Sequence, residues 1–231
     1  MYVLTIDQRG SSTDVDRVPE FLDALHRISR GFERSVGDEV QGVLNDPRDV
    51  VEVSLHALRS GLWYVGVGIG RVNEPQPASP REGSGAAFVA ARQAVERAKA
   101  AGSHVPLAVV SGAAGRGAPA TDDSEEGARA CANAEAVLRL VGRLVQERTE
   151  AQWRVVDALR ARNGHDPGRH GQQKHVARDL GISEQSVSRA IIRSGWQEEW
   201  AARPAVEMLL ATAHGLVLKA ASPEAPDRGE R

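Results

Sequence analysis

The sequence predicts an α/β or α+β domain followed by an all-α region, and three observations lead to this division. Over residues 1–111, short runs rich in β-branched residues alternate with amphipathic helical patterns. From about residue 124 onward, apolar residues recur only at helical spacing. The charge also changes sign, because residues 1–147 carry 16 Lys+Arg against 20 Asp+Glu, whereas residues 148–196 carry 9 against 5. An acidic front and a basic compact segment are typical of a sensor or enzyme joined to a nucleic-acid binder.

The front half contains predicted elements in the order βαββαβαβ. A strand over 2–7 ends at an acid, and an amphipathic helix follows over 16–29. A hairpin over 32–44 comes next, and Asp46 before Pro47 caps a second helix. The remaining elements are a strand over 62–70, a helix over 84–100 and a strand over 105–110. Helices that alternate with strands predict a sandwich in which the helices cover one face of the sheet.

The strand over 62–70 carries glycines at 66, 68 and 70. Because these positions lack side chains, one face of the strand is bare. A ligand or another backbone can approach the sheet closely there, and the sequence leaves both alternatives open.

Acidic side chains end the first strand and occupy the hairpin turn. Asp7 ends the strand, and Asp38 and Glu39 follow the turn glycine Gly37. If the two strands are neighbours, these carboxylates lie close together, and carboxylate oxygens are the ligands that Mg²⁺ or Mn²⁺ prefers. We therefore expect Asp7, Asp38 and Glu39 to hold a divalent ion that neutralises a polyphosphate. The alternative is that Asp7 and Ser12 cap the following helix and that the hairpin acids form a solvated turn.

The loop after the first strand offers donors for phosphate. The backbone N–H groups of Gly10, Ser11 and Ser12 can donate hydrogen bonds to phosphate oxygens. We therefore expect the phosphates of a nucleotide to lie beside this loop.

Three segments carry a resemblance to a known family. VLTIDQRGSS, RSVGDEVQGVL and YVGVGIG…GSGAAFVAAR resemble, in this order, signature segments of class III nucleotidyl cyclases, and VGDEV is similar to the GGDEF motif of diguanylate cyclases. Both families have a palm-type, ferredoxin-like core, so the resemblance implies such a domain over residues 1–115. It also implies that two divalent ions lie at the strand and hairpin acids and that Arg92 steadies charge in the transition state. Arg34 and Gly37 then belong to the nucleotide site, since Arg34 stands where cyclases carry a purine-selecting residue.

One departure from the cyclase pattern bears on activity. Phe88 stands four residues before Arg92, where the cyclase helix carries an asparagine that orients the reacting nucleotide. This difference favours a domain that binds a purine nucleotide over one that converts it. Over nearly the whole chain, the sequence resembles SatD-family proteins, small bacterial proteins with a cyclase-like front and a helix-turn-helix back.

Residues 172–196, QQKHVARDLGISEQSVSRAIIRSGW, have the pattern of a helix-turn-helix, and a plain structural hairpin is the alternative. Ala177 is small where the two helices meet, Gly181 makes the turn, and Ser183 caps the second helix. The predicted internal core consists of Val176, Leu180, Ile182, Val187 and Ile191. The residues expected to contact double-stranded DNA are Lys174, Arg178, Ser183, Gln185, Ser186, Ser188, Arg189 and Arg193.

The segments around this motif complete a second domain. Thr149 and Gln152 form a capping box that starts a helix before the helix-turn-helix. The stretch 203–218 is too apolar for a free helix, so it packs on the DNA-binding unit or across a dimer, and paired half-sites favour a homodimer. The predicted divisions are the cyclase-like domain (1–115), a linker and connecting helix (116–147), the DNA-binding domain (148–219) and a disordered tail (220–231).

Composition indicates a cytoplasmic protein. Cys131 is the single cysteine and excludes an intrachain disulfide, and the start MYVLTIDQRG lacks the basic and long apolar regions of a secretory signal. The longest uncharged stretch is too short and too rich in glycine to span a bilayer, so we expect no membrane partner.

The sequence favours a dimeric DNA-binding regulator whose front domain senses a purine nucleotide together with Mg²⁺ or Mn²⁺. A second hypothesis is a metal-dependent nucleotidyl cyclase or a related phosphoryl-transfer enzyme. A third is a DNA binder with a vestigial dimerisation domain.

Overall fold

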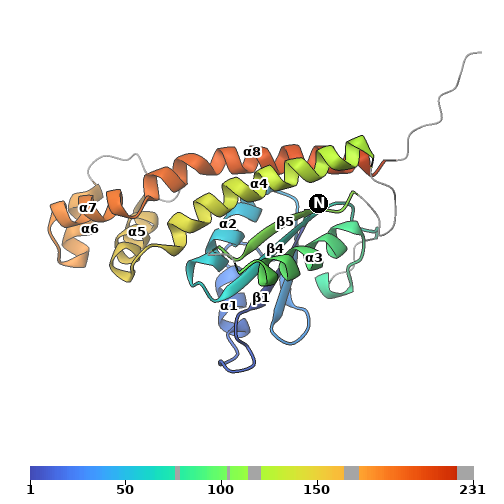
Figure 1. Cartoon of the computed structure of the whole chain (residues 1–231). Coiled ribbons are helices and arrows are strands. Elements are labelled where there is room, and N and C mark those ends of the chain that lie inside the picture. Colours follow the sequence, from blue (N-terminus) through green and yellow to red (C-terminus); the bar gives the residue numbers. More distant parts are fainter. Residues whose placement is uncertain (76–78, 103–104, 114–120, 164–171, 223–231) are drawn as a thin grey trace, which may run out of the picture.

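The computed structural model describes residues 1–75, 79–102, 105–113, 121–163 and 172–222, and structural statements below refer to these residues. They form a mixed α+β fold in which a five-stranded sheet is joined to long helices (Figure 1). The strands are β1 (Tyr2–Gln8), β2 (Phe32–Arg34), β3 (Glu39–Leu44), β4 (Trp63–Ile69) and β5 (Leu107–Ser111). The predicted tail, except for its first three residues, lies outside the described ranges, as does the segment 114–120 between sheet and helices.

The helices fall into two sets. Those that accompany the sheet are α1 (Val18–Leu25), α2 (Pro47–Arg59), the short 3₁₀ helix η1 (Pro80–Glu82) and α3 (Ala86–Ala100). Those that follow are α4 (Asp122–Gln146), α5 (Glu150–Asn163), α6 (Gln172–Leu180), α7 (Glu184–Arg193) and α8 (Trp196–Ala220). We call residues 1–111 the sheet unit and helices α4 to α8 the helical region. No described helix is both long and apolar enough to cross a lipid bilayer.

β1 lies in the middle of the sheet, whose strand order is β2-β3-β1-β4-β5. It runs antiparallel to its neighbours β3 and β4, and β5 runs parallel to β4. β2 and β3 form the predicted hairpin. In the register of β1 with β3, Asp7 lies opposite Glu39. The acid that ends the first strand and an acid of the hairpin are therefore neighbours in the sheet.

Helices cover both faces of the sheet, so the prediction that they cover one face is wrong. Tyr2, Leu4 and Ile6 of β1 join the large core to which α1, α2 and α4 contribute. Val3 points the other way and packs against Phe88 of α3. Successive side chains of a strand point to opposite faces, and β1 has buried residues in both sets of positions, with Tyr2, Leu4 and Ile6 on one face and Val3 and Thr5 on the other. Each face therefore needs helices to bury its apolar surface.

The bare face of β4 is occupied by the backbone of α3, which decides between the two alternatives that the glycines left open. A Cβ atom added at Gly66 would lie 2.4 Å from the backbone nitrogen of Val95. One added at Gly68 would lie 2.2 Å from the carbonyl oxygen of Ala87. The glycines therefore let α3 lie directly on the strand.

α1 is shorter than the predicted 16–29. The carboxylate of Asp16 accepts the N–H of Val18 at 3.0 Å, which holds Asp16 outside the helix. At the other end, the N–H groups of Ile28 and Ser29 both donate to the carbonyl of Leu25 at 2.8 Å, which ends the helix in a turn. The other predicted helices of the sheet unit agree with α2 and α3 to within two residues.

The long helices α4 and α8 lie side by side and extend from the sheet unit to α5, α6 and α7 at the far end (Figure 1). α8 buries Val206, Leu210, Ala213 and Val217 within the chain, against α4 and the sheet unit. The Tyr2 hydroxyl donates to the carbonyl of Leu210 at 3.1 Å. The apolar face of the stretch 203–218 is thus covered by α4 and the sheet unit of the same chain. This position is neither of the two predicted ones, on the DNA-binding unit or across a dimer.

Candidate functional site

Asp7 and Glu39 face α3 from adjacent strands, and Lys99 of α3 contacts Asp7. The Lys99 ammonium lies 2.9 Å from Oδ2 of Asp7 and 3.0 Å from Oε1 of Glu96. The Asp7 side chain is 13% exposed and that of Lys99 is 32% exposed, so the carboxylate is largely removed from water whereas Lys99 is partly exposed. A cation of the protein itself therefore contacts the carboxylate that we expected to hold a divalent ion.

The pKa values of both carboxyl groups are raised, and burial is the main cause for each. For Asp7, burial is the largest cause, Lys99 opposes it, and the charge of Asp38 adds to it. For Glu39, burial again comes first, Arg92 lowers the pKa, and Asp7 raises it. The structure thus brings four of the predicted residues, Asp7, Asp38, Glu39 and Arg92, within electrostatic range of one another.

The predicted metal ligands do not form a complete cage in this structure. Within the described ranges, no group of three or more His, Cys, Asp or Glu side chains converges as metal ligands. A divalent ion at Asp7 has to take the place of the Lys99 ammonium. Carboxylates at adjacent positions on neighbouring strands still suit an oxygen-preferring ion, so the residues present fit one in part.

Sequence reasoning missed Lys99, although the sequence contains a signal for it. Arg92, Glu96 and Lys99 stand at positions i, i+4 and i+7 and therefore share one face of α3. That face looks toward Asp7 and Glu39, as the Lys99 contact and the effect of Arg92 on Glu39 indicate.

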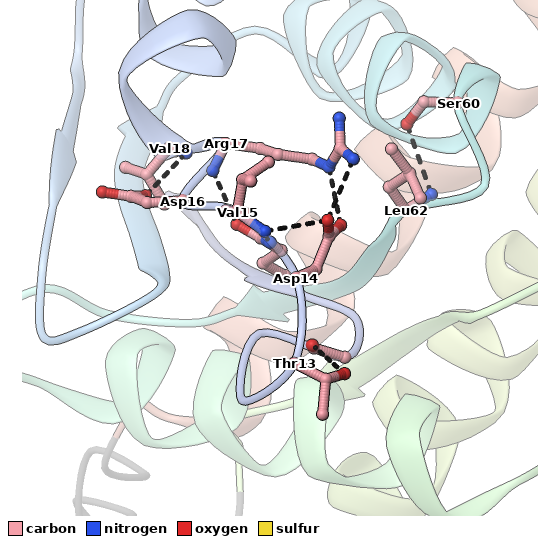
Figure 2. Close-up of polar contacts among 10 residues, drawn as sticks. Thr13, Asp14, Val15, Asp16, Arg17, Val18, Ser60 and Leu62 are labelled. Carbon is pink, nitrogen blue, oxygen red and sulfur yellow. Dashed lines mark hydrogen bonds and ion pairs between the residues drawn. The ribbon is translucent and has the colours of Figure 1, made fainter.

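The loop after β1 is held by its own hydrogen bonds. The N–H groups of Thr13 and Asp14 donate to the carbonyl of Gly10, whose φ is +68°. Figure 2 shows the Asp14 carboxylate between the Val15 N–H, at 2.8 Å, and the guanidinium of Arg17, also at 2.8 Å. These contacts fix the conformation of the loop between β1 and α1.

Ser11 and Ser12 lie at the exposed tip of this loop. Neither forms a hydrogen bond with a described residue, so their N–H groups face solvent. The alternative in which Asp7 and Ser12 cap the next helix is wrong, because Arg17 occupies the N-cap of α1 without a side-chain hydrogen bond. The loop therefore keeps the free donors that phosphate binding requires.

Arg34 lies on the opposite face of the sheet from the carboxylates. It stands opposite Val40, which belongs to the large core, whereas Glu39 points to α3. Its guanidinium contacts Asp16 at 2.5 Å and donates to the carbonyl of Gly37 at 3.0 Å. Gly37 has φ +59° and makes the hairpin turn. The structure therefore does not bring Arg34 to Asp7.

α5, α6 and α7 contact one another and form a small three-helix cluster. Gly181, with φ +65°, lies in the turn between α6 and α7, and the Ser183 hydroxyl accepts the N–H of Ser186 at 3.1 Å. The cluster buries Val176, Ala177, Val187 and Ile191. Ile182 is 38% exposed, so its predicted place in the core is wrong. It lies in the turn, and its N–H donates to the carbonyl of Ala177.

The residues predicted to contact DNA lie on the surface of this cluster. Two of these residues, Ser186 and Ser188, are half-buried. The others are exposed: Lys174, Arg178, Ser183, Gln185, Arg189 and Arg193. None of the four cations among them pairs with an acid within the described ranges. Arg189 and Arg193 are one helical turn apart on α7. The outward face of α7 is therefore cationic and free.

Comparison of the chain with protein-family models, with curated proteins and with solved structures finds no match. The resemblance to SatD-family proteins therefore depends on the sequence motifs alone.

Replacing Lys99 with methionine is expected to lower the free energy of unfolding by about 1–3 kcal/mol at neutral pH, because the largely buried carboxylate of Asp7 loses its charged partner. The pKa of Asp7 then rises further, since only Lys99 opposes the effect of burial. A carboxyl group with a raised pKa binds its proton more tightly in the folded state than in the unfolded state. The loss of stability in Lys99→Met therefore becomes smaller as the pH falls through the pKa of Asp7 in the folded state.

Urea denaturation at about pH 7 and about pH 5 measures this dependence. Glu96→Gln is the matched control, because it removes the other partner of Lys99, which is exposed, and leaves the contact with Asp7. An equal loss of unfolding free energy at both pH values, or a loss of the same size in Glu96→Gln, would contradict the prediction.

Proposed function

We propose that the chain is a DNA-binding transcriptional regulator, and the free cationic face of α7 is the observation that carries this proposal. The arrangement of α6, the Gly181 turn and the capped α7 supports a helix-turn-helix, with α5 as the first helix of the unit. Side chains that point outward from the second helix of such a unit enter the major groove. Guanidinium groups there contact phosphates and the edge of guanine.

We further propose that the regulator is a homodimer, because a dimer reads two half-sites separated by one turn of DNA. α8 cannot supply the interface with its buried face. Leu140 of α4 and Met208 of α8 are 65% and 61% exposed and offer apolar surface on these long helices. Sedimentation of the full chain is expected to give twice the monomer mass, and a monomer at all concentrations would contradict the proposal.

The sheet unit supports a proposed role in nucleotide sensing. The antiparallel order β2-β3-β1-β4 agrees with a ferredoxin-like βαββαβ unit to which β5 is added at the edge. In this proposal a purine nucleotide with Mg²⁺ or Mn²⁺ binds at Asp7, Asp38 and Glu39, with its phosphates beside Ser11 and Ser12. The metal supplies positive charge for the phosphates, and its arrival releases Lys99 from Asp7.

Selection of bound sequences from a pool of random DNA duplexes tests the DNA-binding function. The chain is expected to enrich one sequence. The double variant Arg189→Ala/Arg193→Ala is expected to weaken binding at least about tenfold, because each arginine contributes about 1–3 kcal/mol at a base or a phosphate. It should also reduce the slope of log K against log salt by up to about 2.

Arg81→Ala/Arg129→Ala is the control, since it removes two exposed cations elsewhere. Equal weakening in both double variants would indicate general charge attraction. Absence of any enriched sequence would contradict the function itself.

Thermal unfolding with purine nucleoside triphosphates and Mn²⁺ tests the sensor. We expect the melting temperature to rise when both are present, and the rise to disappear in Asp7→Asn but not in Asp23→Asn, an exposed acid of α1. Conversion of a triphosphate that Asp38→Ala abolishes would instead favour the nucleotidyl cyclase, with Arg92 acting on the transition state. No rise with any nucleotide would leave a DNA binder with a vestigial front domain.

A further inference from the structure

A cavity of about 350 Å³ lies where the sheet unit meets the helical region, and we call it the junction cavity. Its wall contains five arginines: Arg27, Arg48, Arg59, Arg160 and Arg203. The first three belong to the sheet unit, and the last two belong to α5 and α8. A cavity of this size admits a small ligand, which would contact both parts of the chain.

Three of these arginines are held by acids. Arg59 makes two hydrogen bonds to Asp157, at 2.8 and 2.6 Å. Arg160 and Arg203 both contact Oε1 of the buried Glu199, at 3.2 and 2.6 Å. These guanidinium groups are fixed in place before any ligand arrives, which lowers the entropic cost of binding.

The other two arginines are not held in ion pairs, although the charge of Arg48 acts on Asp49 and opposes the rise of its pKa. Arg27 and Arg48 are exposed, and their side chains form no hydrogen bond or ion pair with a described residue. Asp49 and Glu52 are the acids in the wall of the cavity. The acids that hold the other arginines, Asp157 and Glu199, bring the number of carboxylates at the cavity to four. They stand against six guanidinium groups, the five of the wall and that of Arg148, so the net charge is +2. The buried Nε of Arg160 also lacks an acceptor among the described residues.

We propose that the junction cavity binds a small organic phosphate, with its dianionic group among Arg27, Arg48 and Arg160. A phosphate monoester carries two negative charges near neutral pH, which match the excess of two positive charges around the cavity. Its oxygens accept hydrogen bonds from the planar guanidinium forks. One of them provides the acceptor that the Nε of Arg160 lacks.

The adjoining surface indicates the organic part of the ligand. A second hollow of about 350 Å³ shares His56, Arg59 and Trp153 with the junction cavity. Phe21 and Trp63 add to its wall and stack on each other with ring centroids 4.1 Å apart. Because these buried rings already stack on each other, a planar ring in the hollow would contact their edges, as in edge-to-face aromatic pairs. A nucleoside monophosphate has both a dianionic phosphate and a planar base, and it is the ligand class that we assign to this site.

This site is separate from the carboxylates of Asp7 and Glu39. Those face α3, whereas the junction cavity lies beside α2, on the opposite face of the sheet. Its wall includes Trp153 and Arg160 of α5, which packs against α6 and α7. A ligand that holds α5 against the sheet unit biases the position of the proposed DNA-binding helices, as coupling between two sites requires.

Titration calorimetry of the full chain with GMP, AMP, guanosine and inorganic phosphate tests the site. We expect a mononucleotide to bind more tightly than guanosine or inorganic phosphate. Arg27→Gln/Arg48→Gln should weaken mononucleotide binding about tenfold to a hundredfold. Both side chains are exposed, so this variant is expected to fold. Arg30→Gln/Arg81→Gln, which removes two exposed cations outside the cavity, should bind as the wild type does.

The ring of His56 provides a second readout. Burial, followed by the charge of Arg59, lowers the pKa of His56 in the free protein. A bound dianion favours the imidazolium, so saturation with GMP or AMP should raise this pKa in an NMR titration.

Two results would overturn the proposal. One is unchanged mononucleotide affinity in Arg27→Gln/Arg48→Gln, or no binding of any of the four probes. The other is loss of binding in Asp7→Asn with binding kept in the double arginine variant, which would place the nucleotide at the carboxylates instead. Binding that survives Asp7→Asn and fails in the arginine variant supports the junction cavity even if the triphosphate sensor proposed above is wrong.

Discussion

Replacing Glu199 with glutamine is expected to lower the free energy of unfolding by about 3–5 kcal/mol, because it removes the common acidic partner of a buried charge cluster. Glu199 is fully buried, and three guanidinium groups surround it. Its carboxylate oxygens lie 2.6 Å from Arg148, 3.2 Å from Arg160 and 2.6 Å from Arg203. The contact with Arg148 is a close ion pair that is not aligned as a hydrogen bond. Glutamine keeps the shape of the side chain but leaves these cations without a compensating charge.

The position of Glu199 explains why the loss should affect the whole molecule. Arg203 also contacts Glu52 of α2 at 2.7 Å, so the cluster joins α8 to the sheet unit. Arg148 connects the end of α4 to α7, since its Nε donates to the carbonyl of Ser194 at 2.8 Å. One carboxylate therefore stabilises contacts among several helices.

Urea denaturation followed by far-UV circular dichroism measures the effect. Glu198→Gln is the matched control, because it makes the same chemical change at the adjacent, exposed position. The control is expected to change stability by no more than about 0.5 kcal/mol. A loss below about 1 kcal/mol in Glu199→Gln would show that the guanidinium groups find other partners.

Gly68→Ala is expected to destabilise the protein by about 3 kcal/mol, through overpacking rather than lost charge. The added Cβ would lie 2.2 Å from the carbonyl oxygen of Ala87 and 2.2 Å from the backbone nitrogen of Ala91. These are backbone atoms of α3, so relief requires the whole helix to move away from the sheet. Such a movement also draws Lys99 away from Asp7.

Gly215→Ala is the control for this prediction. Gly215 lies in α8, and a Cβ added there meets no atom within 4 Å. Because alanine favours helix over glycine, this variant is expected to be more stable by up to about 1 kcal/mol. The same substitution should therefore have opposite signs at the two positions. A loss at Gly215, or no loss at Gly68, would contradict this account of the packing of α3.

Local signals predicted most of the elements correctly. Asp46 accepts the N–H of Arg48 at the start of α2, and Thr149 and Gln152 form both hydrogen bonds of the predicted capping box. Ser183 likewise caps α7. In each case the interacting groups are two or three residues apart, so the sequence contains the whole interaction. The predictions that were wrong concern contacts between distant segments. They are the coverage of only one face of the sheet by helices and the packing partner of α8.

In the candidate site, too, the sequence predicted some features correctly and missed those that depend on contacts between distant segments. The sequence predicted that Asp7 lies close to the hairpin acids Asp38 and Glu39 if their strands are neighbours. The register of β1 with β3 places Glu39 opposite Asp7, and the charge of Asp38 acts on Asp7. The placement of Arg34 on the far face could not be predicted, because strand alternation decides it only once the register is known. Lys99 was missed because its approach to Asp7 depends on how closely α3 lies on β4.

The sequence by itself determined the alternation of strands and helices, the caps and turns, and the presence of cations along α7, because each depends on residues close together in the chain. Only the tertiary structure decided that Lys99 contacts Asp7. It alone brought α2, α5 and α8 around Glu199 and the arginines of the junction cavity. The physical reason is that burial and charge pairing depend on distance in three dimensions. The charged groups that meet around Glu199 and the junction cavity are up to about 150 residues apart in the sequence.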